Sequence, residues 1–164
     1  MRNRMRILAV SAAAIALAAS QIGIAHGQTP PNAYGTVLSG TIQSPICSSD
    51  NFASGEAAGD LHGSFFLAFD CRDGSISGGT WLILVTADGA DGTTEIRGTL
   101  RGQVVDGSFE RDHDGARIVV RGVALAVTEG TGEYAGVGGG TGSLDATADP
   151  EGAPQFVGTI GLTF

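Results

Sequence analysis

Five Asp-Gly dipeptides divide this chain of 164 residues into short apolar or alternating segments. Both residues of the dipeptide tolerate a positive φ, so Asp-Gly is typical of the tight turns that join antiparallel strands. No stretch of ten residues beyond the first 33 repeats its apolar positions with the helical period of 3.6. The pattern therefore predicts an all-β protein. The dipeptides are Asp73-Gly74, Asp88-Gly89, Asp91-Gly92, Asp106-Gly107 and Asp114-Gly115.

Eight strands are predicted, at residues 34–42, 61–70, 79–87, 93–104, 106–111, 116–128, 141–147 and 155–164. Alternation is clear in the last of them, where Phe156, Ile160 and Leu162 share one face and Val157 and Thr159 lie on the other. A period of two with one apolar face indicates half-buried antiparallel strands. Eight such strands joined by hairpins predict an antiparallel up-and-down barrel, which has no free edge. A two-sheet sandwich is the structural alternative.

Two further features concern the packing of these strands. The segment Trp81–Val85 is apolar at every position, so we expect it to lie at the centre of a sheet or at a contact between subunits. Glycines such as Gly98, Gly102 and Gly158 fall inside predicted strands. In a tightly coiled small barrel they relieve crowding and permit bends, which favours the barrel.

The chain has two cysteines, Cys47 and Cys71, with 23 residues between them. In an oxidising compartment we expect them to form a disulfide that ties an irregular crossing loop at 43–60 to the strand at 61–70. Closing a loop of this size contributes roughly 3 kcal/mol through chain entropy. A metal-binding or nucleophilic thiol role is the alternative, but the CxxC spacing typical of such sites is missing.

Residues 1–27 have the composition of a secretory signal peptide. Three arginines precede the uncharged segment 7–19, and Ala25-His26-Gly27 places small residues at positions −3 and −1 of a cleavage site. We expect cleavage after Gly27, with a cut after Ser20 as the alternative. The apolar segment falls short of the roughly 20 residues that span a bilayer, although its extension through Ile24 leaves an uncleaved anchor as a further alternative. The chain is thus predicted to be a secreted or periplasmic bacterial protein.

The part that follows the signal peptide is acidic. Residues 28–33 are a short polar lead-in, and residues 34–164 are predicted to form a single domain. Without the first 27 residues, six arginines face 17 acidic residues and there is no lysine, so the net charge is −11. Because binding to nucleic acid or to an anionic membrane needs clustered basic residues, we expect neither.

None of the motifs for cofactors, metals or nucleophiles is complete. The glycine-rich segment 136–143 lacks the lysine of a phosphate loop. The acidic segments 88–92 and 112–115 do not complete a calcium-binding loop, and a hairpin turn already explains them. The chain has no Gly-x-Ser-x-Gly sequence for a nucleophilic serine. We therefore expect no cofactor and no metal, and we assign no catalytic or ligand-binding residue.

Residues 127–138 read Val-Thr-Glu-Gly-Thr-Gly-Glu-Tyr-Ala-Gly-Val-Gly. This segment resembles the GGTG-x-(F/Y)-x-G-x-x-G stretch of plant dirigent proteins and allene oxide cyclase-like barrels, which have exported bacterial relatives. Order and spacing agree, but Glu129 stands where the family commonly has its first glycine. The resemblance extends over about residues 93–164. It implies an eight-stranded antiparallel barrel, often a dimer or trimer, with an apolar cavity that confines a substrate during cyclisation or coupling.

The same segment is expected to form a tight structural turn. Glycine permits the backbone to turn sharply, and the aromatic side chain is expected to cap the end of the barrel. The residues of this glycine-rich turn are Gly130, Gly132, Tyr134, Gly136 and Gly138.

Two functions fit these observations. The first is a secreted barrel that binds an apolar or aromatic small molecule and steers its cyclisation or coupling without a cofactor. It is motivated by apolar strand residues such as Phe65, Phe69 and Trp81, and it requires an interior cavity of at least a few hundred Å³. The second is a non-catalytic extracellular structural or interaction protein with a filled barrel, whose apolar strands form a homodimer or homotrimer. An ordinary acid–base or metal enzyme is a weaker third hypothesis, because no cluster has the required spacing.

Overall fold

The computed structural model describes residues 32–44, 46–47, 51–111, 117–149 and 155–164. Contacts divide the chain into two units, residues 1–30 and residues 31–164. The first unit lies outside the described residues, and the predicted signal peptide and its cleavage site lie there with it.

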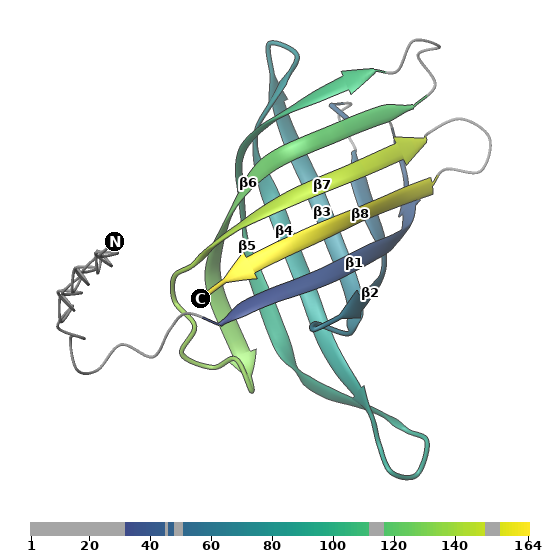
Figure 1. Ribbon diagram of the computed structural model, residues 1–164, viewed down its shortest axis with the longest axis vertical. Coiled ribbons are helices and arrows are strands. Elements are labelled where there is room, and N and C mark those ends of the chain that lie inside the picture. The colour runs from purple at the N-terminus through teal and green to yellow at the C-terminus, as the bar shows by residue number, and fades with distance from the viewer. Residues whose placement is uncertain (1–31, 45, 48–50, 112–116, 150–154) are drawn as a thin grey trace, which may run out of the picture. The chain divides into compact units, whose positions relative to one another are not determined.

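Eight antiparallel strands, paired in chain order, close into a barrel (Figure 1). Each strand pairs with its neighbours in the sequence, and β8 pairs with β1 to complete the ring. No helix occurs in the described part of the chain. The predicted all-β, eight-stranded up-and-down barrel is therefore confirmed, and the sandwich is excluded. The strands are β1 (Ala33–Ile42), β2 (Phe52–Gly59), β3 (Gly63–Arg72), β4 (Ser75–Asp88), β5 (Thr94–Arg111), β6 (Ile118–Gly132), β7 (Thr141–Asp149) and β8 (Gln155–Thr163).

The prediction of an irregular loop over 43–60 is wrong in part, because β2 occupies its second half. The strand consists mainly of alanine, glycine and serine, which have little preference for β-structure and give a weak apolar pattern. Its inward side chains are only Ala53 and Ala57, and Gly55 lies between them. Pairing with β1 and β3 on its two sides imposes the extended conformation on this segment.

The prediction of two strands at 93–104 and 106–111 is also wrong, because both segments belong to β5. Asp106 and Gly107 do not form a turn. The register against β6 shifts on both sides of Asp106, so the dipeptide lies in a bulge inside the strand. Residues that tolerate a positive φ, such as Asp and Gly, occur both in bulges and in hairpin turns. The sequence pattern therefore does not distinguish a bulge from a turn. The predicted number of strands still equals the observed eight, because one observed strand was divided in two and β2 was missed.

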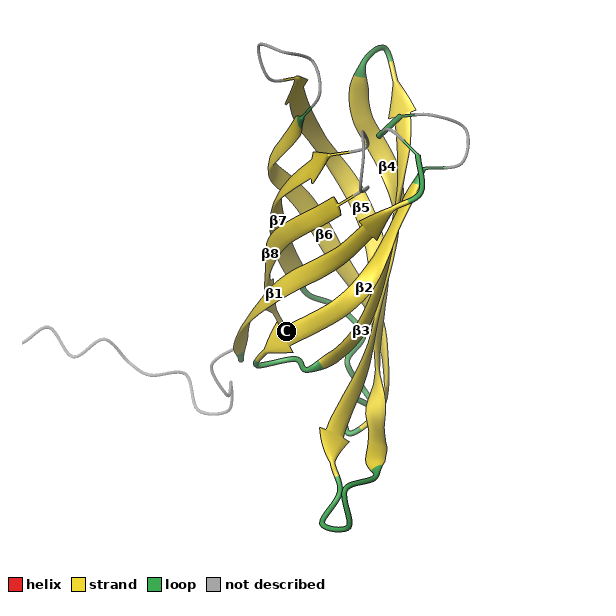
Figure 2. Ribbon diagram, turned by 90° about the vertical axis from the view of Figure 1, so that its right-hand side faces the viewer, coloured by secondary structure: helices red, strands yellow, loops and turns green. Residues whose placement is uncertain are grey.

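Alternation places the apolar side chains inside the barrel. In β8, Phe156, Ile160 and Leu162 are buried, as predicted, while Val157 on the opposite face is 53% exposed. Alternation in β5 places Ile96 on the same face as Leu100 and Val104, but Ile96 is 70% exposed. The register between β4 and β5 shifts just beyond Val85, and the two strands continue as a hairpin that extends past the end of the barrel (Figure 2).

Gly102 shows why glycine is needed on the inner face. Trp81 of β4 lies beside it, is 3% exposed, and donates a hydrogen bond from Nε1 to the carbonyl oxygen of Ala126 at 3.2 Å. A Cβ atom on Gly102 would lie 2.7 Å from the indole ring. The absence of a side chain at this position therefore makes room for the indole against β5.

Cys47 and Cys71 form a disulfide, with their Cα atoms 5.2 Å apart. The bond joins the segment after β1 to the end of β3, at the end of the barrel opposite the β4–β5 hairpin. The predicted pairing is confirmed, and such a bond fits an oxidising compartment.

Candidate functional site

The interior of the barrel is the first place to look for a site, and apolar side chains fill its described part. The hollow among the interior side chains Leu38, Trp81 and Ile160 has a volume of only about 10 Å³. That is about the minimum that holds one water molecule. The ring centroids of Phe65 and Phe156 lie 5.7 Å apart across the interior.

The interior also has no polar group available for chemistry among the described residues. The buried polar side chains there are Thr36 and Asn51. Thr36 Oγ1 accepts a hydrogen bond from the amide of Leu61, and Asn51 Oδ1 accepts one from the amide of Phe69, each at 3.1 Å. Both side chains accept hydrogen bonds from backbone amides, so we assign them a structural role.

The glycine-rich turn lies between β6 and β7 at one end of the barrel. Gly132 and Gly136 have φ values of 63° and 95°, in the left-handed region that glycine adopts without strain. Gly130 and Gly138, at the end of β6 and in the segment before β7, do not have a positive φ.

Tyr134 of this turn packs against the two aromatic residues at the ends of β1 and β8. Its ring meets that of Tyr34 edge-on at 6.5 Å and that of Phe164 at 6.4 Å, while Tyr34 and Phe164 stack at 4.7 Å. Partial burial, with smaller contributions from Tyr34 and Glu133, raises the pKa of Tyr134. The phenol therefore stays protonated at neutral pH and serves as a packing group.

Two arginines of β5 form ion pairs on the outer face. Arg97 bonds Glu133 at 2.7 Å and lies 3.9 Å from Glu95, and Arg101 forms an ion pair with Glu129. The hydrogen bond that Arg97 donates to Glu133 is the main cause that raises the pKa of Arg97. Exposed pairs of this kind contribute little to stability, and the groups that form them are engaged with one another.

The acidic tip of the β4–β5 hairpin is explained by its own turn. Asp91 Oδ1 accepts hydrogen bonds from the backbone amide of Thr93 at 3.1 Å and from its hydroxyl at 2.5 Å. The hydroxyl, followed by the amide, lowers the pKa of Asp91. The other acidic segment, 112–115, lies outside the described residues. Within the described ranges no group of three His, Cys, Asp or Glu is close enough to hold a metal ion.

An apolar cluster lies on the outer face of β2, β3 and β4. We call it the β2–β4 patch and define it as Phe52, Phe66 and Leu82. Phe66 and Leu82 are cross-strand partners, 39% and 37% exposed, and the rings of Phe52 and Phe66 stack at 5.3 Å. Beside the patch is a hollow of about 330 Å³, lined by Phe66, Leu82, Arg101 and others. The outward side chains of Trp81–Val85 thus remain partly exposed in the single chain.

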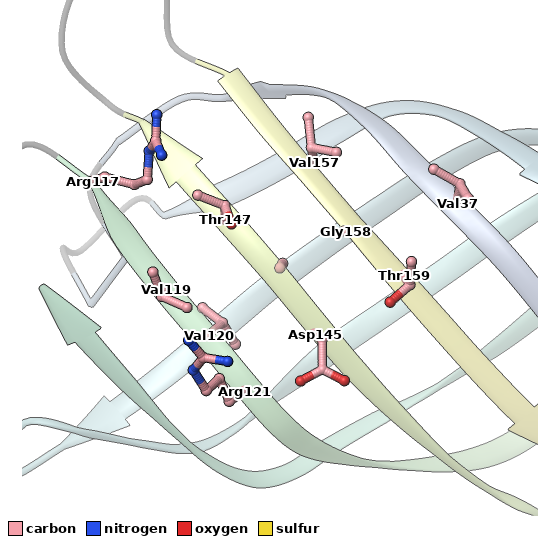
Figure 3. A pocket seen from close by; sticks show the side chains of 11 residues that line it. Val37, Arg117, Val119, Val120, Arg121, Asp145, Thr147, Val157, Gly158 and Thr159 are labelled. Carbon is pink, nitrogen blue, oxygen red and sulfur yellow. The ribbon is translucent and has the colours of Figure 1, made fainter. Parts of the chain in front are cut away.

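A second surface feature, the β6–β8 groove, lies on another part of the outer face (Figure 3). It has a volume of about 480 Å³. Arg121 and the adjoining Arg117 come from the β6 side, and Val37 of β1 and Val157 of β8 form the opposite side. Other residues that line it are Val119, Val120, Asp145, Ala146, Thr147, Gly158 and Thr159.

A bulge in β6 shapes this groove. Val120 pairs with Ala146 and Val123 pairs with Leu144, so two residues of β6 face one of β7. Gly122 in the bulge has a φ of 56°, and its amide donates a hydrogen bond to Asp145 Oδ1 at 2.9 Å. The carboxylate of Asp145 is thereby engaged in holding the bulge.

Sequence reasoning missed both surface features. Alternation shows that Arg117, Val119 and Arg121 share a face, and that Phe66 lies opposite the inward Phe65 and Leu67. It does not show which strands lie side by side, and both features are formed by side chains from several strands.

The described residues contain no helix that is long and apolar enough to cross a membrane. Comparisons with protein-family models, with curated proteins and with solved structures found no match.

Proposed function

We propose that this protein is an exported, non-catalytic interaction protein that works as a homodimer or homotrimer, with its copies meeting at the β2–β4 patch. The observation that carries the proposal is the pair of exposed apolar side chains, Phe66 and Leu82, on a barrel whose described interior is already full. A filled interior supports this second hypothesis over a small molecule held inside.

The physical argument for a second copy at the patch rests on charge. With a net charge of −11 after residue 27, two copies repel one another unless they meet at a face of low charge. The β2–β4 patch is such a face, because its three side chains are all apolar. A closed barrel has no free strand edge for pairing, so association must use faces. The adjoining hollow offers room for an apolar side chain of the partner.

Export is supported by the sequence of residues 1–27 and by the disulfide between Cys47 and Cys71. The resemblance to allene oxide cyclase-like and dirigent proteins supports an oligomer, because barrels of that family often form dimers or trimers. We propose no reaction for it, because no described residue is placed for catalysis.

The test is the mass of the assembly in solution. The full-length chain is expressed, the protein is collected from the medium or periplasm, and its mass is measured by native mass spectrometry and light scattering at micromolar concentration. We expect a discrete dimer or trimer for the wild type. The combined variant Phe66→Ser and Leu82→Ser should raise the dissociation constant of the oligomer at least tenfold. Ile96→Ser is the matched control, because it removes an exposed apolar side chain elsewhere.

A monomeric wild type, or an oligomer that the double variant leaves intact, contradicts the proposal. Circular dichroism establishes that each variant is folded. An organic molecule released from the purified protein on denaturation would instead support the first hypothesis, the ligand-holding barrel.

A further inference from the structure

The β6–β8 groove is basic on one side and apolar on the other. On the side of β6, Arg117 and Arg121 form no ion pair within the described part of the protein. On the other side, Val37 and Val157 are 49% and 53% exposed. Arg97 and Arg101, in contrast, both have acidic partners. Among the described residues, two guanidinium groups without an ion pair therefore lie beside exposed valines, on a protein with a large excess of acids.

The groove is positive on its β6 side. Asp145 is the acidic residue that lines it, and one of its oxygens accepts the hydrogen bond of Gly122. Two guanidinium groups therefore face one engaged carboxylate. Arginine binds carboxylates with planar, paired hydrogen bonds, so charge complementarity selects an anionic partner here.

The spacing of the groove residues indicates the shape of that partner. Arg117 and Arg121 are four residues apart along an extended segment, which corresponds to about 13 Å. Two carboxylates at positions i and i+4 of an extended peptide have the same separation and point to the same side. Residues i+1 and i+3 of that peptide point to the other side, toward Val37 and Val157.

We propose that the β6–β8 groove binds an extended acidic segment of another protein, in which carboxylates alternate with apolar residues. The carboxylates contact Arg117 and Arg121, and the apolar side chains cover Val37 and Val157. The backbone of the segment adds no strand, because every strand of the barrel already has two partners. This site is independent of the β2–β4 patch, which lies on other strands.

The test uses the folded full-length protein and the synthetic peptide Glu-Val-Thr-Val-Glu with blocked ends, followed by amide chemical shifts in NMR. We expect saturable shifts confined to β6, β7, β8 and the start of β1. The combined variant Arg117→Gln and Arg121→Gln should weaken binding at least tenfold. Arg72→Gln is the matched control, an exposed arginine at the end of β3, and it should bind as the wild type does.

Two further peptides test the pattern itself. Val-Glu-Thr-Glu-Val has the same composition with the positions exchanged, and Lys-Val-Thr-Val-Lys reverses the charge. Both should bind at least tenfold more weakly than the first peptide. Equal binding of either one, no saturable shift with the first peptide, or equal loss in the Arg72→Gln control overturns the proposal. Repeating the titration with Phe66→Ser and Leu82→Ser separates this site from self-association, since peptide binding should persist in that variant.

Discussion

Replacing Gly102 with alanine should destabilise the barrel by about 1–3 kcal/mol, the usual cost of overpacking a filled interior. The added Cβ would lie 2.7 Å from two ring atoms of Trp81, and closer still to the carbonyl oxygen of Ala126. Neither neighbour yields easily. The indole is 3% exposed and held by its hydrogen bond to that same carbonyl, and the carbonyl belongs to the paired strand β6.

Gly161→Ala, in strand β8, is the matched control. Its Cβ would meet only Ser143 Oγ, at 3.8 Å, which is an ordinary contact. Neither glycine has a positive φ, so alanine fits both backbones. The control should gain about 0.4–1 kcal/mol because alanine restricts the unfolded chain. The two variants should therefore differ by roughly 1.4–4 kcal/mol in the free energy of unfolding.

The assay is equilibrium unfolding in urea, followed by far-ultraviolet circular dichroism and by the fluorescence of Trp81, which is the single tryptophan. Circular dichroism is needed because the substitution changes the surroundings of the fluorophore. If Gly102→Ala unfolds at the same urea concentration as Gly161→Ala, the close packing of the indole against β5 is refuted. The argument for a filled barrel then loses its main support, and the ligand-holding hypothesis regains weight.

Two other predictions follow from the ends of the barrel. Replacing Cys47 and Cys71 with alanine should lower the free energy of unfolding by about 3 kcal/mol, because the bond closes a loop with a sequence separation of 24. Urea unfolding measures this loss. If a reductant leaves the stability of the wild type unchanged, the prediction is contradicted. Because burial raises the pKa of Tyr134, its stabilising contribution is complete below the ordinary tyrosine pKa and is lost as the pH rises through the raised value. The tyrosinate absorbance should show a late ionisation that disappears in Tyr134→Phe, and a titration unchanged by that substitution would refute the assignment.

Turn residues and apolar alternation predicted most of the fold. Asp73-Gly74 forms the turn from β3 to β4, with φ values of 52° and 77°, and the face assigned to Phe156, Ile160 and Leu162 is the buried one. Each of these features depends on residues close together in the chain. Errors arose where a local pattern has two structural meanings, as at Asp106-Gly107, or where it is weak, as in β2.

The surface features required a different kind of information. Ser54, Phe66, Leu82 and Arg101 follow one another across four strands, and no local pattern connects positions so far apart in the sequence. The register of the barrel decides whether such residues meet, and bulges change it, as the one in β6 does beside Asp145.

The amino-acid pattern was enough for the strand class and for most of the inward faces, because alternation and turn preference act over a few residues. Two cysteines in a chain predicted to be exported were enough for the disulfide. Closure of the ring decided the rest. It brought β8 against β1, and it gathered Arg117 and Arg121 beside Val157 and Val37. The register of β4 on β5 packed Trp81 onto Gly102, so that the described interior is full. These contacts depend on which strands become neighbours, and that is a property of the whole chain.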